Sequence, residues 1–348
     1  MTTAASAQDS AFKAKLAAYR DLVLPTLEAV LPRREPRRHL YDLIAHHFSR
    51  VGKGLRPALC IATCRAFGGR VDDALKSAAA LELLHNAFLV HDDIEDDSEF
   101  RRDQPTLHMQ HGVPLAVNTG DAMNALSLRL LKENLPLLGG AKTWQVMQEF
   151  DHLLVESLEG QAMELGWIRD NDCTVSADDY LLMTLKKTCW YSFIHPCRIG
   201  ALIARGDELD LNRFNRFGFF MGAAFQIQDD VLNLVGDPHA YGKEIGGDLW
   251  EGKRTLILSH LFQQLDDAEL QRVRSFLAKP RRQRLRRDID WLNQRLLQHG
   301  SIEYARDASR QLIRAALHEF ATAFSEAAEG EDKAFIRQCV EYVVQRDA

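Results

Sequence analysis

Two clusters of carboxylates carry the most distinctive chemistry in the sequence. The first is HDDIEDD at residues 91–97, in which Asp92 and Asp96 are four residues apart and share one face of a helix, with Asp93 beside them. Like charges at this spacing repel one another. An acidic run of this kind is usually a solvated helix end, but the residues that precede this one are too apolar for a solvated helix.

The second cluster repeats the arrangement in QIQDDVLN at residues 226–233. Asp229, Asp230 and Asn233 occupy the same relative positions as the three aspartates of the first cluster. Mg²⁺ binds through one or two carboxylates and completes its octahedron with water and substrate phosphates. Two such clusters without a thiolate therefore predict several Mg²⁺ ions around one diphosphate.

Two segments, 75–90 and 217–235, are apolar on nearly every face, and each runs directly into one of the clusters. A helix that is apolar all round is expected to be buried. Apolar residues recur with a helical period along most of the chain, and the alternation typical of strands is nearly absent. The sequence therefore predicts an all-α protein. Helices are expected over 10–31, 38–50, 54–67, 71–98, 114–134, 140–168, 177–204, 208–235, 249–278, 283–298, 302–326 and 331–346.

The chain is expected to form a single domain over residues 11–348, because no change of composition, repeat or Pro/Ser-rich linker divides it. Residues 1–10 lack a basic start and a following apolar run, so they are expected to be a disordered tail rather than a secretory signal. No apolar stretch reaches the ~20 residues that span a bilayer. Six scattered cysteines form no CxxC pair or zinc pattern, which favours a reduced, cytoplasmic protein.

The overall charge limits the classes of ligand. A formal charge of −6 argues against general affinity for nucleic acid, so any phosphate must be held by local cations. Candidates near the clusters are Lys53, Arg56, Arg101, Arg102, Lys187 with Thr188, Lys243 and Lys253. Lys53 and Arg56 stand at an expected helix start, where free amides and the helix dipole favour phosphate.

One segment comes close to a nucleotide-binding loop but does not match it. In GDPHAYGKE at residues 236–244 the glycines are one residue too far apart for a Walker loop, and Glu244 stands where the motif has Ser or Thr. The sequence therefore argues against P-loop kinase chemistry.

Taken together, the motifs resemble those of the trans-isoprenyl diphosphate synthases, also called the polyprenyl synthetase family. The resemblance covers most of the chain. It is carried by GKGLRP at 52–57, LLHNAFLVHDDIED at 83–96, RR at 101–102, KKT at 186–188, FQIQDD at 225–230, GK at 242–243 and EGKRT at 251–255. The resemblance implies a bundle of long antiparallel helices around a central cavity, usually in a homodimer, that condenses isopentenyl diphosphate with an allylic diphosphate.

The resemblance also implies roles for individual side chains. Asp92, Asp93, Asp96, Asp229 and Asp230 are expected to bind Mg²⁺ on the allylic diphosphate. Isopentenyl diphosphate is expected to contact Lys53, Arg56, His85 and Arg102, and the allylic diphosphate Arg101, Lys187, Lys243 and Lys253. Thr188 and Gln226 match groups beside the developing cation. His85 lies seven residues before Asp92 and so on nearly the same face, which favours a ligand role over that of a core histidine.

Two residues depart from the family pattern. Asn233 stands where the second motif often ends in Asp, so one charge is lost although a side-chain oxygen remains. Asp103 follows the arginine pair where Gly is common, and its side chain is expected to point to solvent.

Product length in the family is set by side chains on the helix below the first motif, which here are Ala87 and Phe88. Phe88 lies about one turn, ~5.4 Å, below Asp92. One small and one aromatic residue favour the C20 product, geranylgeranyl diphosphate, over farnesyl or longer chains. Alternatively, Phe88 only packs against a neighbouring helix and length is set deeper, near Leu84 or Leu81.

The expected chemistry is ionisation followed by condensation. Mg²⁺ and cations neutralise the charge that builds on the diphosphate as its C–O bond breaks, the isopentenyl double bond attacks the allylic cation, and the departing pyrophosphate takes the proton. A terpene cyclase or head-to-head synthase of related fold would not need the second-substrate cations Lys53, Arg56 and Arg102. A non-catalytic partner subunit that binds prenyl diphosphates would be expected to have lost aspartates, and both clusters are present.

Overall fold

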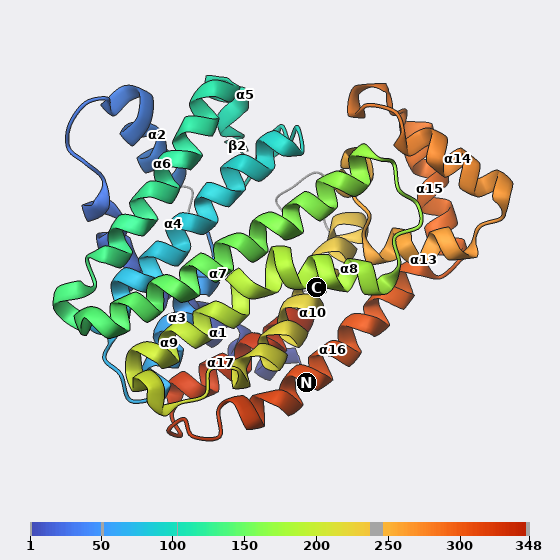
Figure 1. Cartoon of the computed structure of the whole chain (residues 1–348). Helices are drawn as coiled ribbons and strands as arrows, with labels where there is room; N and C mark the ends of the chain where they lie inside the picture. The colour runs from blue at the N-terminus through green and yellow to red at the C-terminus, as the bar shows by residue number, and fades with distance from the viewer. Residues whose placement is uncertain (1, 50–51, 103, 237–245, 346–348) are drawn as a thin grey trace.

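Long helices that run in roughly one direction form most of the molecule, as Figure 1 shows for α4 (Val71–Glu95), α6 (Val113–Lys132) and α7 (Leu135–Arg169). This computed structural model describes residues 2–49, 52–102, 104–236 and 246–345. The first part of the chain also contains α1 (Thr2–Val30), η1 (Arg37–Tyr41), α2 (Asp42–Ser49), α3 (Leu55–Ala66), β1 (Phe100–Arg101), β2 (Gln104–Pro105) and α5 (Leu107–His111).

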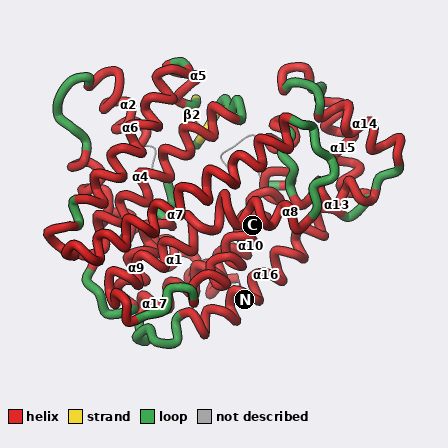
Figure 2. Tube along the Cα trace, viewed as in Figure 1, coloured by secondary structure: helices red, strands yellow, loops and turns green. Residues whose placement is uncertain are grey.

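The second part of the chain is helical as well. It contains α8 (Ala177–Thr184), η2 (Leu185–Ile194), α9 (His195–Arg205), η3 (Gly206–Glu208), α10 (Arg213–Val235), α12 (Gly247–Glu251), α13 (Leu256–Gln264), α14 (Asp267–Leu277), η4 (Arg281–Gln283), α15 (Arg286–Gln298), α16 (Ser301–Ala323) and α17 (Glu331–Gln345). The strands of the described residues are β1 and β2, a two-residue antiparallel pair that is the yellow segment of Figure 2. The predicted all-α class is confirmed.

Most of the expected helices are present within a few residues of their predicted ends. Residues 2–10, which the sequence suggested would be a tail, form the start of α1. The break expected after residue 134 is displaced: α7 begins at Leu135, and a kink at Gly139 (φ 75°, ψ 171°) separates its first residues from the rest. The pair β1–β2 and the short helix α5 were not predicted, because segments this short carry too little periodicity to recognise.

The predicted helix over 249–278 is wrong, because this region forms three helices. Gly252 ends α12 with a left-handed backbone (φ 77°). The side chain of Thr255 then accepts the backbone N–H of Leu258 and begins α13. Asp266 accepts the N–H of Glu269 in the same way and begins α14. A side-chain oxygen at these positions satisfies N–H groups that have no partner inside the helix, so each one favours a new start.

The helices that carry the two carboxylate clusters are buried along most of their length. On α4 the run Ala78–Ala79–Ala80 is fully buried, and α3 and α6 pack closely against this helix. Helix α10 is enclosed by α16 and η2, and Phe214 and Phe217 are completely buried on it. The expectation that both acidic runs terminate buried helices is therefore confirmed. Among the described residues, no helix is both long and apolar enough to cross a membrane.

The π-helix η2 lies between α7 and α10, and three glycines allow this close approach. A Cβ on Gly160 of α7 would lie 2.3 Å from the backbone nitrogen of Lys187. On the α10 side, a Cβ on Gly222 would lie 2.7 Å from Cys189 Sγ, and one on Gly218 would lie 2.5 Å from Ile194 Cγ1. Real Cβ atoms do not approach so closely, so η2 can occupy this position only against glycine. π-Helical segments occur frequently at functional sites.

We predict that Gly160→Ala lowers the free energy of unfolding by about 1–3 kcal/mol, because the new methyl group meets the rigid backbone of η2. The measurement is urea unfolding followed by circular dichroism. Gly166→Ala on the same helix is the matched control, because a Cβ there meets no atom within 4 Å. The control should be neutral or stabilising by up to ~1 kcal/mol, and equal behaviour of the two variants would contradict the packing argument.

Candidate active site

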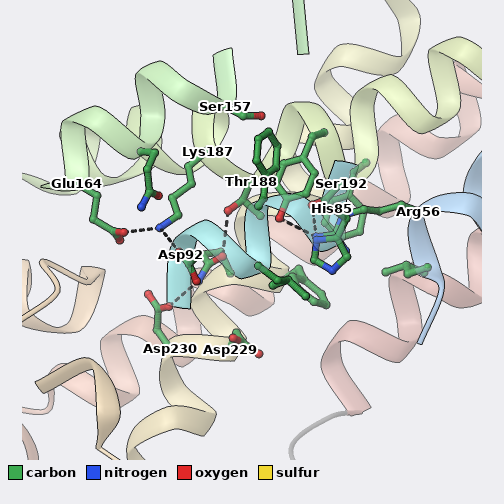
Figure 3. Close-up of a pocket in the computed structure, with 18 of the residues that line it drawn as sticks. Arg56, His85, Asp92, Ser157, Glu164, Lys187, Thr188, Ser192, Asp229 and Asp230 are labelled. Carbon is green, nitrogen blue, oxygen red and sulfur yellow. Dashed lines mark hydrogen bonds and ion pairs between the residues drawn. The ribbon is translucent and has the colours of Figure 1, made fainter. Parts of the chain in front are cut away.

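A cavity of about 560 Å³ lies between the start of α3, α4, α7, η2 and α10. It brings together most of the residues that the motifs singled out. Its lining includes Lys53, Arg56, His85, Phe88, Asp92, Arg101, Arg102, Lys187, Thr188, Gln226, Asp229, Asp230 and Lys253. Figure 3 shows Asp92, Asp229 and Asp230 at one end of this cavity and Arg56, His85 and Ser192 at the other.

The first aspartate cluster is held by Arg101 of β1. Arg101 Nε donates to Asp93 Oδ1 at 2.6 Å, and Nη2 donates to Asp92 Oδ2 at 3.2 Å. Burial opposes the charge of this guanidinium, but Asp93 and Asp92 together raise the pKa of Arg101. Asp93 is buried against this arginine and does not line the cavity, whereas Asp92 does. The unpredicted strand pair therefore positions a predicted cation.

Lys187 of η2 links the first cluster to α7. Its Nζ donates to Asp92 Oδ1 at 3.3 Å and to the buried carboxylate of Glu164. Figure 3 shows this ammonium group between the two carboxylates. Burial would lower the pKa of Lys187, but Glu164 and Asp92 raise it, so the side chain remains a cation.

Asp96, the third residue of the first motif, lies one turn further along and terminates α4. Its carboxylate accepts from Lys253 Nζ at 2.7 Å, and the same ammonium group lies 3.0 Å from Glu251 Oε2. Burial raises the pKa of Asp96 to about 7, although Lys253 opposes this shift. Asp96 borders a second cavity, of about 770 Å³, that also includes Asp92 and Lys253 in its lining.

The second cluster is anchored by a chain of hydrogen bonds. Tyr180 OH donates to Asp230 Oδ2 at 2.7 Å, and Gln226 Nε2 donates to Asp230 Oδ1 at 2.9 Å. Thr188 Oγ1 in turn donates to Gln226 Oε1 at 3.0 Å. Burial raises the pKa of Asp230 to about 7 in spite of both donors. The predicted residues Thr188, Gln226 and Asp230 thus form one connected network.

The opposite end of the cavity is organised around Arg56 of α3. Arg56 Nη2 donates to Tyr191 OH at 2.9 Å and to Ser192 Oγ at 2.8 Å. The guanidinium carbon also lies 4.4 Å from the centroid of the Tyr191 ring, a cation–π distance. Arg56 Nε is buried and has no hydrogen-bond partner among the described residues.

His85 and Arg102 lie in the same region. His85 Nδ1 is buried and lacks a hydrogen-bond partner among the described residues, and burial keeps the pKa of this histidine well below its usual value. Glu82 is enclosed between Arg56 and Arg102, yet its burial raises its pKa. A Cβ on Gly52 would lie 2.6 Å from Arg102 Nη2, so the glycine in GKGLRP makes room for this arginine.

Phe88 both lines the cavity and packs against Tyr191. Its ring meets that of Tyr191 edge to face with centroids 5.4 Å apart. Ala87, in contrast, is completely buried in the main core and does not line the cavity. Leu81 and Leu84 are buried in the same core.

Two predicted positions, Lys243 and Asp103, lie outside the described residues.

Asn233 is buried, and its Oδ1 accepts the backbone N–H of Asp248 at 3.0 Å. This side chain therefore holds the start of α12 against α10.

The carboxylates of the first cluster pair with cations, whereas Asp230 accepts from neutral donors. Among the described residues, no three side chains of Asp, Glu, His or Cys lie close enough together to hold a metal ion by themselves. Mg²⁺ needs only one or two carboxylates, because water and phosphate oxygens supply its remaining ligands. The all-oxygen donor set of Asp92 and Asp229 on the cavity wall is of the type that Mg²⁺ prefers.

Comparison with known proteins decides the family. Residues 37–292 match the family described as polyprenyl synthetase. The chain belongs to the polyprenyl synthetase family. It is therefore a trans-isoprenyl diphosphate synthase, as the motifs suggested.

This synthase is similar to several named proteins, including the following three from archaea. It is 31% identical to a geranylgeranyl diphosphate synthase of Saccharolobus solfataricus over 76% of this chain and 78% of that protein. It is 30% identical to a geranylgeranyl pyrophosphate synthase of Geoglobus acetivorans over 94% and 96% of the two chains. The crystal structure of geranylgeranyl pyrophosphate synthetase from Pyrococcus horikoshii superimposes with a TM-score of 0.86 at 28% identity, covering 98% of this chain and 100% of the other.

Several residues of the polyprenyl synthetase site were missed in the sequence, among them Glu164, Tyr180 and Tyr191. Glu164 and Tyr180 contact Lys187 and Asp230 across 23 and 50 residues of chain, so no local spacing pointed to them. Tyr191 lies three residues after Thr188, the last residue of the KKT motif, and both side chains line the cavity. Its position one turn beyond a predicted site residue was a usable signal.

Proposed function

We propose that this synthase condenses isopentenyl diphosphate with an allylic diphosphate in a Mg²⁺-dependent reaction and that its main product is C20 geranylgeranyl diphosphate. The names of the relatives support the product. The observation that carries the reaction is the cavity itself, which has carboxylates and cations at one end and a separate basic group at the other. Residues 11–348 would act as one catalytic domain.

The allylic diphosphate would lie at the aspartate end of the cavity. Mg²⁺ held by Asp92, Asp229 and neighbouring aspartates would supply positive charge that stabilises the leaving diphosphate. Arg101 and Lys187 already point into this region and would bind the diphosphate oxygens directly. Cations fixed in place before the C–O bond breaks stabilise the charge without reorganisation, which is the main source of catalysis in such sites.

Isopentenyl diphosphate would lie at the other end, with its diphosphate on Lys53, Arg56 and Arg102. The buried Arg56 Nε and His85 Nδ1 have no hydrogen-bond partner in the described part of the chain, which supports a ligand-binding role for this end. The double bond would then attack the allylic cation beside Thr188 and Gln226, and the departing pyrophosphate would accept the proton. Phe88 and Phe225 line the cavity and would exclude water from the cation.

The aspartate assignment predicts that Asp92→Ala or Asp229→Ala lowers turnover by at least roughly 10²-fold while the fold is retained. The assay is incorporation of labelled isopentenyl diphosphate at increasing Mg²⁺, with circular dichroism as the check on folding. Asp97→Ala is the control, because this neighbouring carboxylate is 53% exposed and belongs to neither metal group. If a folded Asp92 or Asp229 variant retained most of its Mg²⁺-dependent activity, the metal assignment would be wrong.

The second-substrate assignment predicts that Arg56→Gln raises KM for isopentenyl diphosphate by roughly tenfold, because one charge-assisted hydrogen bond to the substrate is lost. Tyr191→Phe should give a smaller increase, because the ring remains and only the hydroxyl partner of Arg56 is lost. KM for the allylic substrate is the internal control in the same steady-state experiment. An increase confined to the allylic substrate would reverse the two half-sites.

The chain-length assignment predicts that Phe88→Ala gives longer products, because Phe88 is the aromatic side chain of α4 that enters the cavity below Asp92. Products are dephosphorylated and sized by chromatography. Phe219→Ala is the matched control: Phe219 is half-buried on α10 and does not line the cavity. An unchanged distribution in the Phe88 variant would mean that length is set elsewhere.

We also propose a homodimer through α6 and α7. Large apolar side chains are exposed along one stripe of each helix: Val117 and Leu128 at 39% and 40%, and Trp144, Val155 and Leu158 at 62%, 48% and 60%. Spacings of 11 and 14 residues keep them on one face, and such patches usually mark interfaces.

Trp144→Glu with Val155→Glu should convert a dimer to a monomer in sedimentation velocity. Leu297→Glu is the control, because Leu297 is 67% exposed on α15, away from the stripe. A wild-type chain that sediments as a monomer would refute the dimer, and a control variant that dissociates equally would refute the stripe.

A further inference from the structure

Two arginine-rich loops lie at the same end of the molecule. The first, residues 33–38, runs into η1 just before α2, and the second, residues 279–287, runs from the end of α14 through η4 into the first residues of α15. Figure 1 shows both at the top of the view, the end at which α4 finishes. Their exposed side chains are Arg33, Arg34, Arg37, Arg38, Arg282, Arg286 and Arg287.

These arginines have little charge compensation. Arg33, Arg34, Arg38 and Arg287 form no ion pair with another described residue, as the salt bridges of the structure involve other side chains. Arg37 pairs with Asp42 at 3.3 Å and Arg286 with Asp290 at 3.0 Å, both in exposed positions where a pair contributes little. Arg282 lies 3.8 Å from Asp97.

One arginine of the second loop has a different role and shows that the loop is rigid. Arg284 is only 7% exposed. Its guanidinium donates to the carbonyl oxygens of Leu249, Trp250, Leu277 and Lys279. Because this internal arginine fixes the backbone, its neighbours Arg282, Arg286 and Arg287 are presented outward in a defined arrangement.

Apolar side chains are exposed at the same end. Leu285 stands among the arginines of the second loop and is 44% exposed. Phe100 of β1 is 58% exposed and Met109 of α5 is 53% exposed. Figure 1 shows β2, the partner of β1, and α5 at the top of the view with the two loops.

Carboxylates are present at this end as well. Glu35 accepts the backbone N–H of Arg37 at 2.9 Å, and Glu99 is exposed beside Phe100. Asp42, Asp97 and Asp290 are the partners named above, and Asp288 pairs with Lys279. The arginines still outnumber these groups, in a chain whose formal charge is −6. The rest of the molecule therefore carries a net negative charge.

We propose that this end of the molecule docks on an anionic lipid surface. Arginines together with exposed Leu, Phe and Met side chains are the composition of an interfacial binding site, in which cations meet lipid headgroups and apolar groups enter the headgroup boundary. A nucleic acid would match the arginines but would leave the three apolar side chains in water. The acidic remainder would be repelled by the same surface, so the molecule would bind in one orientation.

The docking end also borders the first aspartate motif. The cavity of about 770 Å³ is lined by Phe100, Arg281 and Arg282 and also by the motif residues Asp92 and Asp96. A long isoprenyl diphosphate leaving on this side would meet a lipid surface immediately. This functional benefit rests on the proposed function, whereas binding itself is measured without substrate and is independent of it.

The test is flotation of the purified full chain with vesicles made of equal parts phosphatidylglycerol and phosphatidylcholine, and with phosphatidylcholine alone. We expect binding to the anionic vesicles only, and its loss as salt is raised. The combined change Arg282→Gln, Arg286→Gln and Arg287→Gln should weaken binding by roughly tenfold or more, and so should Arg33→Gln with Arg34→Gln and Arg38→Gln. Leu285→Ser should weaken it less.

The matched control removes the same charge elsewhere, by Arg310→Gln, Arg314→Gln and Arg337→Gln on α16 and α17. These side chains are exposed and lie on helices far from the docking end in Figure 1. The proposal is overturned if the wild-type chain does not float, if the control loses binding as much as the loop variants, or if millimolar glycerol 3-phosphate releases the protein. Release by a polyanion with no effect of Leu285→Ser would also overturn it, in favour of a nucleic acid or acidic protein partner.

Discussion

The balance of charge at the ends of two buried helices is the constraint on which the rest of the site depends. Helices α4 and α10 are fixed by their apolar faces, and their acidic ends must therefore share one cavity. Burial raises the pKa of both Asp96 and Asp230 to about 7 even though neighbouring groups oppose the shift, so burial strongly disfavours ionised carboxylates here. The structure compensates with cations from other elements: Arg101 from β1, Lys187 from η2 and Lys253 from the segment after α12.

This constraint explains why η2 takes an unusual form. Lys187 and Thr188 must reach the aspartates from a helix held tightly between α7 and α10, and Gly160 and Gly222 allow the backbone of η2 to approach both neighbours. A side chain larger than glycine at either position would meet the backbone or side chain of η2 and push Lys187 away from its partners. Packing of small residues therefore determines the electrostatics of the site, because it decides which charges can meet.

Local patterns predicted the helices and the residues whose roles depend on their own motif. Asp92, Lys187 and Arg56 were found because each belongs to a short run that is distinctive by itself. Partners that come from another element were not found: no spacing in the sequence relates Tyr180 to Asp230. The same limit applies to Asn233, since its hydrogen bond to Asp248 depends on where the chain returns after α10. The error at 249–278 has a different cause, because the capping residues Thr255 and Asp266 were present but were given less weight than the apolar period.

The contact with Tyr191 shows that the two interpretations of Phe88, a barrier to chain growth and a packing residue, are compatible. The sequence left open whether Phe88 limits the growing chain or packs against a neighbouring helix, and in the structure its ring lines the cavity while its edge-to-face contact with Tyr191 holds it in place. The hydroxyl of the same tyrosine accepts from Arg56. An aromatic ring can act as a barrier only if something fixes its rotamer, so packing is a condition for the barrier and not an alternative to it. Because Tyr191 contacts both Arg56 and Phe88, the Arg56 end of the cavity and its apolar part are connected through one side chain of η2.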